Sequence, residues 1–353
     1  MFVIYSNMKK ILNFKLFESS SNLTDEQVQF LNETVDGTWK HNSLTRRIDI
    51  DGDFDCSDLD LSDFKGISFG VVSGDFDCSH NELESLKDCP EEVGGSFDCD
   101  YNKLISLKGA PLSVGVDFDC SYNKKLKSLD FAPTEIGGKV DCSHCGLSSL
   151  AGLPEALNGS LICSNNNLTD LSGAPKSVRS LMAKNNNLSS LKGCPSNIEK
   201  NLNVSQNELK NLNGLDPKTQ IIRGDMDFSN NEISDISNIP IPREGVNLND
   251  NGISTMILES LRPIFSTMKR YNLGFKAALL RSWEEGYGNK SRIIDNLFSL
   301  VDVSTAYSAI TEHPKKFEII DYIKKELPSV WRKIEDYDKE GADTSADLAD
   351  LGF

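Results

Sequence analysis

The sequence lacks several features that mark common functional classes. It contains no run of 18 apolar residues, which a membrane-spanning helix would need. It contains no Gly-rich motif of the kind that cradles phosphates. Its last cysteine is Cys194, so the C-terminal part of the chain offers no thiol nucleophile. These absences argue against a membrane span, a nucleotide-binding loop and cysteine-dependent chemistry in the C-terminal part.

The first residues also lack the pattern of a secretory signal. Lys9, Lys10, Asn13 and Lys15 leave no seven-residue apolar core, and no small-residue cleavage box follows. We therefore expect a protein that no signal peptide exports.

One repeated phrase fills the middle of the chain, in residues 48–253. It reads Phe-Asp-Cys-Ser-x-Asn-x-Leu-x-x-Leu-x-Gly-x-Pro, and its Cys position recurs ten times at intervals of 20 to 24 residues. The ten occupants are Cys56, Cys78, Cys99, Cys120, Cys142, Cys163, Ala183, Val204, Phe228 and Leu248. A period of this length predicts a solenoid in which each repeat buries its apolar face against its neighbours.

These ten copies resemble the leucine-rich repeats of bacterial and phage proteins with a Cys-Ser-x-Asn-x-Leu core. We therefore predict an α/β fold, a leucine-rich repeat solenoid with a parallel concave sheet and a convex side of turns and extended segments. The resemblance implies a recognition scaffold, and it leaves the partner open because a fold does not define a function.

Within each repeat, the alternating apolar residues are predicted to point into the core, as Phe97 and Cys99 do in the third copy. An asparagine follows each strand, where the chain bends and buried backbone groups need partners. The expected ladder contains Asn81, Asn102, Asn123, Asn166, Asn186, Asn207, Asn231 and Asn251, with Cys145 in the fifth repeat.

Six of the nine cysteines occupy the inward strand position. Adjacent strands are close enough that a disulfide is not excluded by distance, but buried free thiols in a reducing compartment explain the column better. Cys142 and Cys145 have zinc-like spacing, yet no second pair follows and the repeat register explains both. We predict no metal, no cofactor and no catalytic residue.

The negative charge belongs to the repeats, because residues 49–252 carry 17 Lys and Arg against 32 Asp and Glu. Outward carboxylates are expected in two columns on the concave face, one directly before the Cys position and one two residues earlier. The columns contain Asp55, Asp77, Asp98, Asp119 and Asp141, and Asp53, Asp75 and Asp117. A third outward column, two residues after the Cys position, contains Asp58, His80, Tyr101, Tyr122 and His144.

An acidic strip edged by aromatic and imidazole groups suits a protein or peptide with a basic surface. The same charge disfavours direct binding of nucleic acid to this face. Two other readings remain open: acidity that keeps a long sheet soluble, and divalent-ion binding, for which no compact ligand loop is present.

Residues 1–22 form a separate N-terminal segment. From Met8, it resembles the capsid-targeting peptides of T-even-like phages, which end in a site cut by the head-maturation protease. The matching residues are Leu16 and Glu18, with Ser19 following. The seven residues before Met8 depart from that pattern, unless Met8 is the true start. The alternative is a frayed amphipathic terminus.

Residues 23–47 are predicted to form a helical cap. Thr24 and Gln27 make a capping box that opens a helix to about Val35, with Val28, Leu31 and Val35 as its apolar stripe. The helix is expected to cover the irregular first repeat, where Leu59 replaces the ladder asparagine.

Residues 254–337 show an apolar period near 3.6 and predict a small helical region, and residues 338–353 an acidic, disordered tail. The expected helices cover 256–268, with a kink or break at Pro263, and 273–283, 291–301, 314–327 and 328–337. Some bacterial leucine-rich repeat effectors carry a cysteine-dependent ubiquitin ligase here, which this region cannot be. Its one histidine, His313, and the carboxylates Glu284, Glu285 and Asp295 read as helix entry and a solvated face.

The sequence therefore predicts a non-enzymatic, monomeric protein-interaction scaffold that binds a basic protein or peptide and no membrane. The favoured hypothesis is a phage protein packaged in the head and processed after Glu18. The second is an unpackaged, host-directed inhibitor in the host cytoplasm. An enzyme is third.

Overall fold

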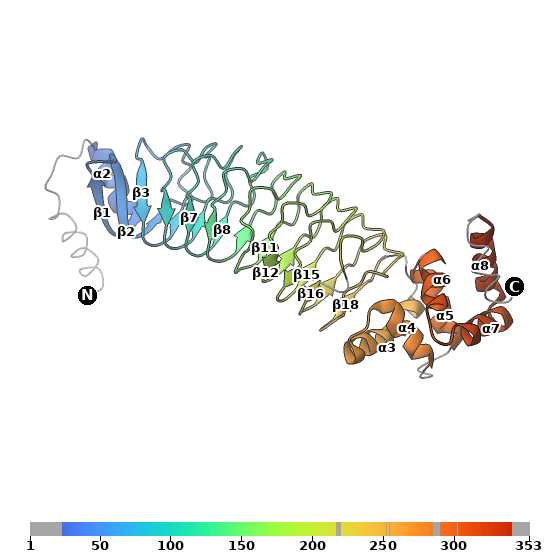
Figure 1. The fold of residues 1–353 in the computed structure, drawn as a ribbon. Coiled ribbons are helices and arrows are strands. Elements are labelled where there is room, and N and C mark those ends of the chain that lie inside the picture. The colour runs from blue at the N-terminus through green and yellow to red at the C-terminus, as the bar shows by residue number, and fades with distance from the viewer. Residues whose placement is uncertain are drawn as a thin grey trace, which may run out of the picture. The chain divides into compact units, whose positions relative to one another are not determined.

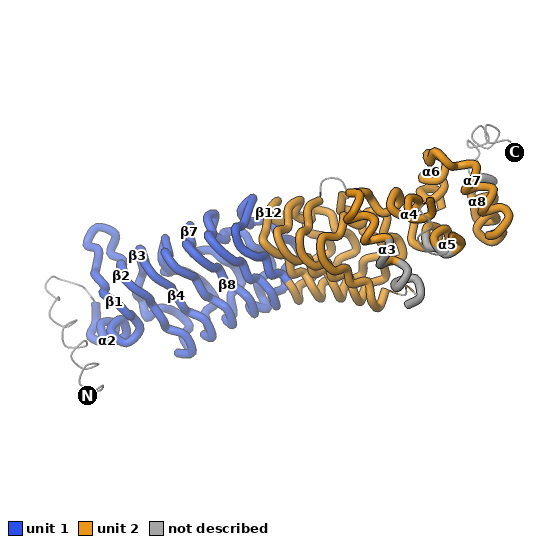
Figure 2. The backbone as a smooth tube through the Cα atoms, turned by 90° about the horizontal axis from the view of Figure 1, so that it is seen from below, with its two compact units in different colours: residues 1–163 blue, residues 164–353 orange. Residues whose placement is uncertain are grey.

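The computed structural model describes residues 23–216, 220–251, 253, 255–284, 290–301 and 303–340 (Figure 1). The chain divides into two compact units, residues 1–163 and 164–353, which Figure 2 shows in blue and orange. The division falls inside the repeats, and the two units are described separately below.

Unit 1 opens with the predicted capping box. Helix α2 spans Asp25–Thr34; the Thr24 side chain accepts from the Gln27 backbone N–H, and the Gln27 side chain accepts from the Thr24 N–H. Its buried residues are Phe30, Leu31 and Thr34, so the predicted stripe was right only at Leu31. Phe30 packs edge-on against Phe54, with 6.0 Å between ring centroids. The helix therefore covers the first phenylalanine of the core and leaves Leu59 half exposed.

The prediction of a purely helical cap over residues 23–47 was wrong. Strand β1 (Val35–Asn42) follows α2 and pairs antiparallel with strand β2 (Arg47–Asp55). At the Gly37–Gly52 pair, a Cβ on either residue would meet a backbone oxygen at 2.2 Å, so only glycine fits. Because β1 pairs along β2, the cap also supplies a strand beside the first repeat.

The predicted parallel sheet is present in both units. In unit 1, β2 is followed in register by β4 (Phe76–Asp77), β6 (Phe97–Asp98), β8 (Phe118–Asp119), β10 (Val140–Asp141) and β11 (Leu161–Ile162). In unit 2, the corresponding strands are β13 (Leu181–Met182), β15 (Leu202–Asn203), β17 (Met226–Asp227) and β18 (Val246–Asn247). These ten strands carry the ten repeats, in which the aligned Cys position follows directly after the short strands.

The other side of each repeat is extended, as predicted, and its segments also pair into parallel sheets. Unit 1 has β3 (Phe69–Val72), β5 (Glu92–Val93), β7 (Ser113–Val114) and β9 (Glu135–Ile136). Unit 2 has β12 (Ser177–Val178), β14 (Asn197–Ile198) and β16 (Ile221–Ile222). The fold is a leucine-rich-repeat-type solenoid whose described turns have two strand sides.

The core between these sides is built as the alternation predicts. Phe54, Phe76, Phe97 and Phe118 are fully buried, and neighbouring rings stack with centroids 4.7, 5.6 and 6.0 Å apart. The aligned Cys positions are buried in every repeat, and all nine cysteines are free thiols. This confirms the predicted column of buried thiols.

The asparagine ladder is also confirmed. Asn102 Nδ2 donates to the carbonyl oxygens of Cys78, Cys99 and Asp100 at 2.9, 3.2 and 3.0 Å, and its Oδ1 accepts from the Leu83 N–H at 2.9 Å. One side chain thus satisfies four backbone groups in two repeats, which fixes the bend after each strand.

Unit 2 ends in helices α3 (Thr255–Tyr271), α4 (Phe275–Glu284), α5 (Lys290–Leu300), α6 (Val303–Thr311), α7 (Lys316–Glu326) and α8 (Pro328–Glu340). Helix α3 continues through Pro263, where a break had been one expectation, and α6 was not predicted. Helix α8 continues to Glu340, so the predicted disordered tail at 338–353 began three residues too early. None of the helices that the structure describes is long and apolar enough to cross a membrane.

Candidate interaction face

The candidate site is the surface of unit 1 at the ends of β2, β4, β6, β8 and β10, which we name the acidic face. It comprises the two predicted aspartate columns and the predicted ring column. Residues 49–100, which supply its first three repeats, carry 16 acidic and two basic side chains. The structure brings all twelve predicted partner-binding residues onto this one surface, but it assigns several of them a second role.

The aspartates directly before the Cys position close the turn after each strand. Asp98 Oδ1, for example, accepts from the Asp100 backbone N–H at 3.0 Å. The same bond, two residues along, is made at 2.9 to 3.0 Å by Asp55, Asp77, Asp119 and Asp141. Asn203, Asp227 and Asn247 make it in unit 2. The position therefore needs a side-chain oxygen for the turn, and the sequence analysis missed this role.

The second aspartate column links one repeat to the next. Asp53 Oδ1 accepts from the Asp75 N–H at 2.8 Å, Asp75 from Ser96 at 2.6 Å, and Asp117 from Lys139 at 2.6 Å. A carboxylate that accepts a backbone N–H makes a charge-assisted hydrogen bond. These bonds offset part of the repulsion between like charges that the sequence analysis expected.

The ring column lies in turns, and its predicted placement on strands was wrong. His80, Tyr101, Tyr122 and His144 have φ values of 53°, 45°, 56° and 53°, in the left-handed region. The chain turns here after strands only two residues long. Asn165, Asn185, Gln206 and Asn230 hold the same position in unit 2, and asparagine adopts this conformation more readily than histidine or tyrosine does.

The four rings of this column stack on one another. Centroids are 4.4 Å apart for His80 and Tyr101, 4.0 Å for Tyr101 and Tyr122, and 4.2 Å for Tyr122 and His144, with interplanar angles of 17°, 11° and 9°. The inner ring faces are therefore occupied by neighbouring rings, and Tyr101 remains 43% exposed. The column presents ring edges, hydroxyl groups and imidazole nitrogens to a partner.

Carboxylates flank the first ring of the column on both sides. His80 Nδ1 lies 3.8 Å from Asp58 Oδ1, and His80 Nε2 lies 3.8 Å from Asp100 Oδ1. Asp100 stands where the neighbouring repeats have Ser79 and Ser121. This substitution adds a carboxylate to the third repeat only.

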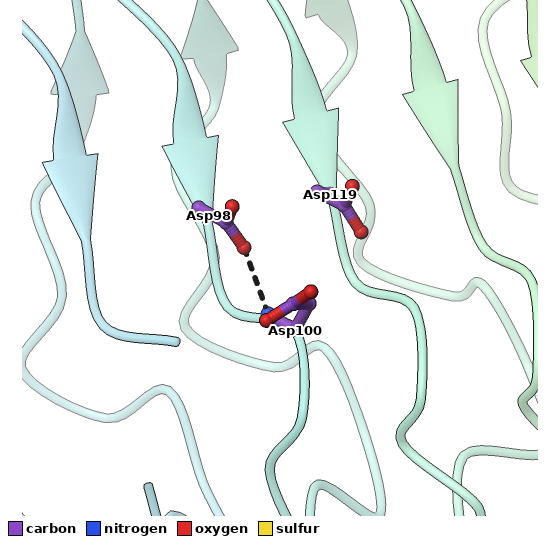
Figure 3. A group of neighbouring side chains, drawn as sticks. All are labelled: Asp98, Asp100 and Asp119. Atoms are coloured by element: carbon purple, nitrogen blue, oxygen red, sulfur yellow. Dashed lines mark hydrogen bonds between the residues drawn. The ribbon is translucent and has the colours of Figure 1, made fainter. Parts of the chain in front are cut away.

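Asp98, Asp100 and Asp119 converge, as Figure 3 shows, with one oxygen of each within 4.8 Å of the others. Burial, then the charges of Asp100, Asp119 and Asp77, raises the pKa of Asp98 to about 7. Burial and the charge of Asp119 raise the pKa of Asp100 to about 6, against the lowering effect of His80. Burial and Asp119 also raise the pKa of Asp141, although Lys139 lies 4.0 Å away. Part of the face therefore titrates near neutral pH.

Carboxylate oxygens are the ligand type that Ca²⁺ and Mg²⁺ prefer. Asp98 and Asp119, however, each use one oxygen for a turn hydrogen bond. An acidic cluster of this kind does not by itself define an ion site, and we assign none.

Two further groups of candidate residues contribute nothing to this face. Cys142 Sγ donates to the Ile162 carbonyl and Cys145 Sγ to that of Cys120, so their spacing serves the repeat. In the helical region, His313 Nε2 lies 3.9 Å from Glu284 Oε1. The predicted processing residues Leu16, Glu18 and Ser19 lie outside the described residues.

The fold and the face define a leucine-rich-repeat-type scaffold that fits a protein-interaction role. No family model matches the chain, and no curated protein matches it. Among solved structures, the chain is similar to YopM from Yersinia enterocolitica WA-314 at 17% sequence identity, over 70% of this chain and 72% of that chain, with a TM-score of 0.24. At that TM-score the likeness carries no argument, and the functional proposal rests on the face itself.

Proposed function

We propose that the acidic face binds a basic surface or an extended basic peptide of another protein and performs no catalysis. The observation that carries this proposal is the stacked ring column. Histidine and tyrosine occupy four consecutive left-handed turn positions in unit 1, whereas amide side chains occupy the equivalent positions in unit 2. Turn geometry alone would favour asparagine throughout, so the rings are better explained by contact with a partner.

The charge around the rings indicates what kind of partner fits. The turn and bridging bonds described above are printed for one oxygen of each aspartate, and the other oxygen can meet a cation on a partner. A continuous acidic field also steers a basic partner toward the face and repels phosphate groups. We therefore propose a basic protein as the partner and no direct nucleic acid.

Replacement of the two tyrosines by asparagine tests this proposal. Tyr101→Asn with Tyr122→Asn removes the central rings but supplies the side chain that the left-handed turn prefers, so the fold is expected to persist. Binding to a basic partner, captured by cross-linking and identified by mass spectrometry, should fall by at least tenfold. Gln206→Asn is the matched control, because it changes the equivalent turn of unit 2. Equal loss in both variants, or in neither, would contradict the assignment.

The finer identity of the protein remains our proposal from the sequence resemblance. We propose a monomeric phage protein of the Cys-Ser-x-Asn-x-Leu type, packaged in the virion interior and cut between Glu18 and Ser19. The alternative is an unpackaged, host-directed inhibitor that acts in the reducing host cytoplasm. N-terminal peptide mass spectrometry on purified virions and infected-cell lysate separates them. A mature N-terminus at Ser19 in virions supports packaging, and an intact N-terminus found only in lysate removes it.

A further inference from the structure

We propose that pH gates binding at the acidic face, with the ring column and the carboxylates packed against it as the sensor. The inference rests on the proposed function and adds its regulation. A basic partner should bind tightly at pH 8 and weakly near pH 5.5, and its binding near neutral pH should release protons.

The geometry places titratable groups in direct contact with the ring column. His80 is held between Asp58 and Asp100 at 3.8 Å on each side, and its ring stacks on Tyr101. Asp100 is at once a neighbour of His80 and a member of the cluster with Asp98 and Asp119. A proton on any of these groups therefore changes the charge that a partner meets beside the rings.

The remaining charged groups around the sensor belong to neighbouring strands. Asp77 on β4 faces Asp98, Asp119 on β8 faces Asp98, Asp100 and Asp141, and Asp141 on β10 faces Asp100. Lys139 lies 3.5 Å from Asp119 and 4.0 Å from Asp141. At the far end of the column, His144 stacks on Tyr122. Carboxylates outnumber cations among these groups, so the sensor is electrostatically crowded in its ionised form.

Acidification changes both kinds of group in the same direction. The raised pKa values of Asp98, about 7, and Asp100, about 6, mean that these carboxylates take up protons between pH 8 and pH 5.5. Protonated imidazoles add positive charge over the acidic part of this range. The face then attracts a basic partner less. Conversely, a bound cation favours the ionised carboxylates, so binding near pH 7 must expel protons.

Asp100 offers a specific way to alter this sensor. The neighbouring repeats carry serine at its position, so Asp100→Ser is expected to fold. It removes the charge that faces both Asp98 and His80. The pH at which affinity is half lost should move downward, because Asp98 would then ionise at lower pH. His80→Asn, a residue type that suits this turn, is a second variant that lowers the imidazole contribution.

Isothermal titration calorimetry with an oligo-arginine peptide tests the inference. Titrations of the full chain at pH 7.0 in phosphate and in imidazole buffer give the protons released from the difference in apparent enthalpy. We expect about one proton released, an affinity at least tenfold lower at pH 5.5 than at pH 8, and smaller values of both in Asp100→Ser. Glu92→Gln on β5, outside the face, should behave as the wild type.

The outcomes separate this inference from the proposed function. Peptide binding with no proton release and equal affinity at pH 5.5 and pH 8 would overturn the pH gate and leave the binding face standing. Proton release that Asp100→Ser and His80→Asn both leave unchanged would remove the ring column as the sensor. Failure of the peptide to bind at any pH would overturn the proposed function and the gate together.

Discussion

The thiol of Cys145 donates to the carbonyl oxygen of Cys120 at 3.3 Å, and Cys145 thereby replaces an asparagine of the ladder. One repeat earlier, Asn123 Nδ2 makes the equivalent bond to the Cys99 carbonyl at 3.0 Å. Cys145 also donates to the Ser143 carbonyl at 3.5 Å. A thiol is a weaker donor than an amide and carries one hydrogen where the amide carries two. The ladder position therefore requires a side-chain donor, and asparagine fills it best.

This comparison predicts the order of stability of ladder variants. Asn102→Ala leaves four buried backbone groups without their side-chain partner and should lower the free energy of unfolding by about 3 kcal/mol. Asn102→Cys should cost roughly half as much, because a thiol restores part of the bonding. Urea denaturation followed by circular dichroism measures both. Cys145→Asn serves as the reverse test, and destabilisation by that change would contradict the account.

Neutralisation of the aspartate column should increase stability and reduce binding. Asn203 and Asn247 show that an amide oxygen can close the same turn. Asp77→Asn, Asp98→Asn and Asp119→Asn together should therefore keep the turns and relieve repulsion, which raises the free energy of unfolding by about 1 kcal/mol. Affinity for a basic partner at low salt should fall by tenfold or more.

Serine in place of asparagine is the informative contrast for that triple variant. A serine side chain is shorter and loses the turn hydrogen bond, so the stability gain should disappear. Retained partner affinity in the folded asparagine variant would count against the acidic face.

Thermal stability should rise as the pH falls from 8 toward 5. The folded-state pKa of Asp98 is about 7, above its ordinary value of 3.8, so the folded state holds more protons than the unfolded state between those values. The cost of the ionised carboxylate is fully present above pH 7 and is relieved as the pH falls below it. After allowance for solvent screening, the effect is on the order of 1 kcal/mol.

Differential scanning calorimetry at several pH values measures this dependence as a rise in Tm of a few degrees. In Asp98→Asn the rise should be much smaller, because the main raised group is gone. A Tm that falls steadily from pH 8 to pH 5 in the wild type would contradict the burial of Asp98.

The cysteine column should be chemically inert in the native protein. Burial raises the pKa of Cys163, Cys194 and Cys145 to about 12, and that of the other inward thiols further still. The thiolate is the reactive form, so little of it is present at pH 8. An aromatic disulfide reagent should modify at most the two partly exposed thiols, Cys145 and Cys194, in the native state and all nine in denaturant. Rapid native reaction of more than two would contradict the packing.

Much of the fold was readable from the sequence because it repeats. The ten aligned positions predicted parallel strands, buried thiols and the ladder of asparagines, since an error in one copy is corrected by the other nine. The non-repeating ends were harder to predict. Residues 35–42 became a strand because Gly37 and Gly52 allow two backbones to approach closely, and α6 was missed because Val303–Thr311 is short and apolar.

The candidate site was predicted as a set of residues but not as a geometry. Periodicity placed Asp98, Tyr101 and their counterparts on one surface, and the structure agrees. It could not show that the strands end after Asp98, so that Tyr101 lies in a left-handed turn and its ring stacks on Tyr122 at 4.0 Å. Nor could it show that the aspartates accept backbone N–H groups.

The sequence by itself determined the solenoid, its register and its acidic surface, because these follow from the period and from the residue types in each repeat. Only the tertiary structure decided which charges are crowded. Asp98, Asp100 and Asp119 come from two repeats and converge because parallel strands bring equivalent positions side by side. The titration of this surface near neutral pH is therefore a property of the packed repeats, since it arises from burial and from charges on neighbouring strands.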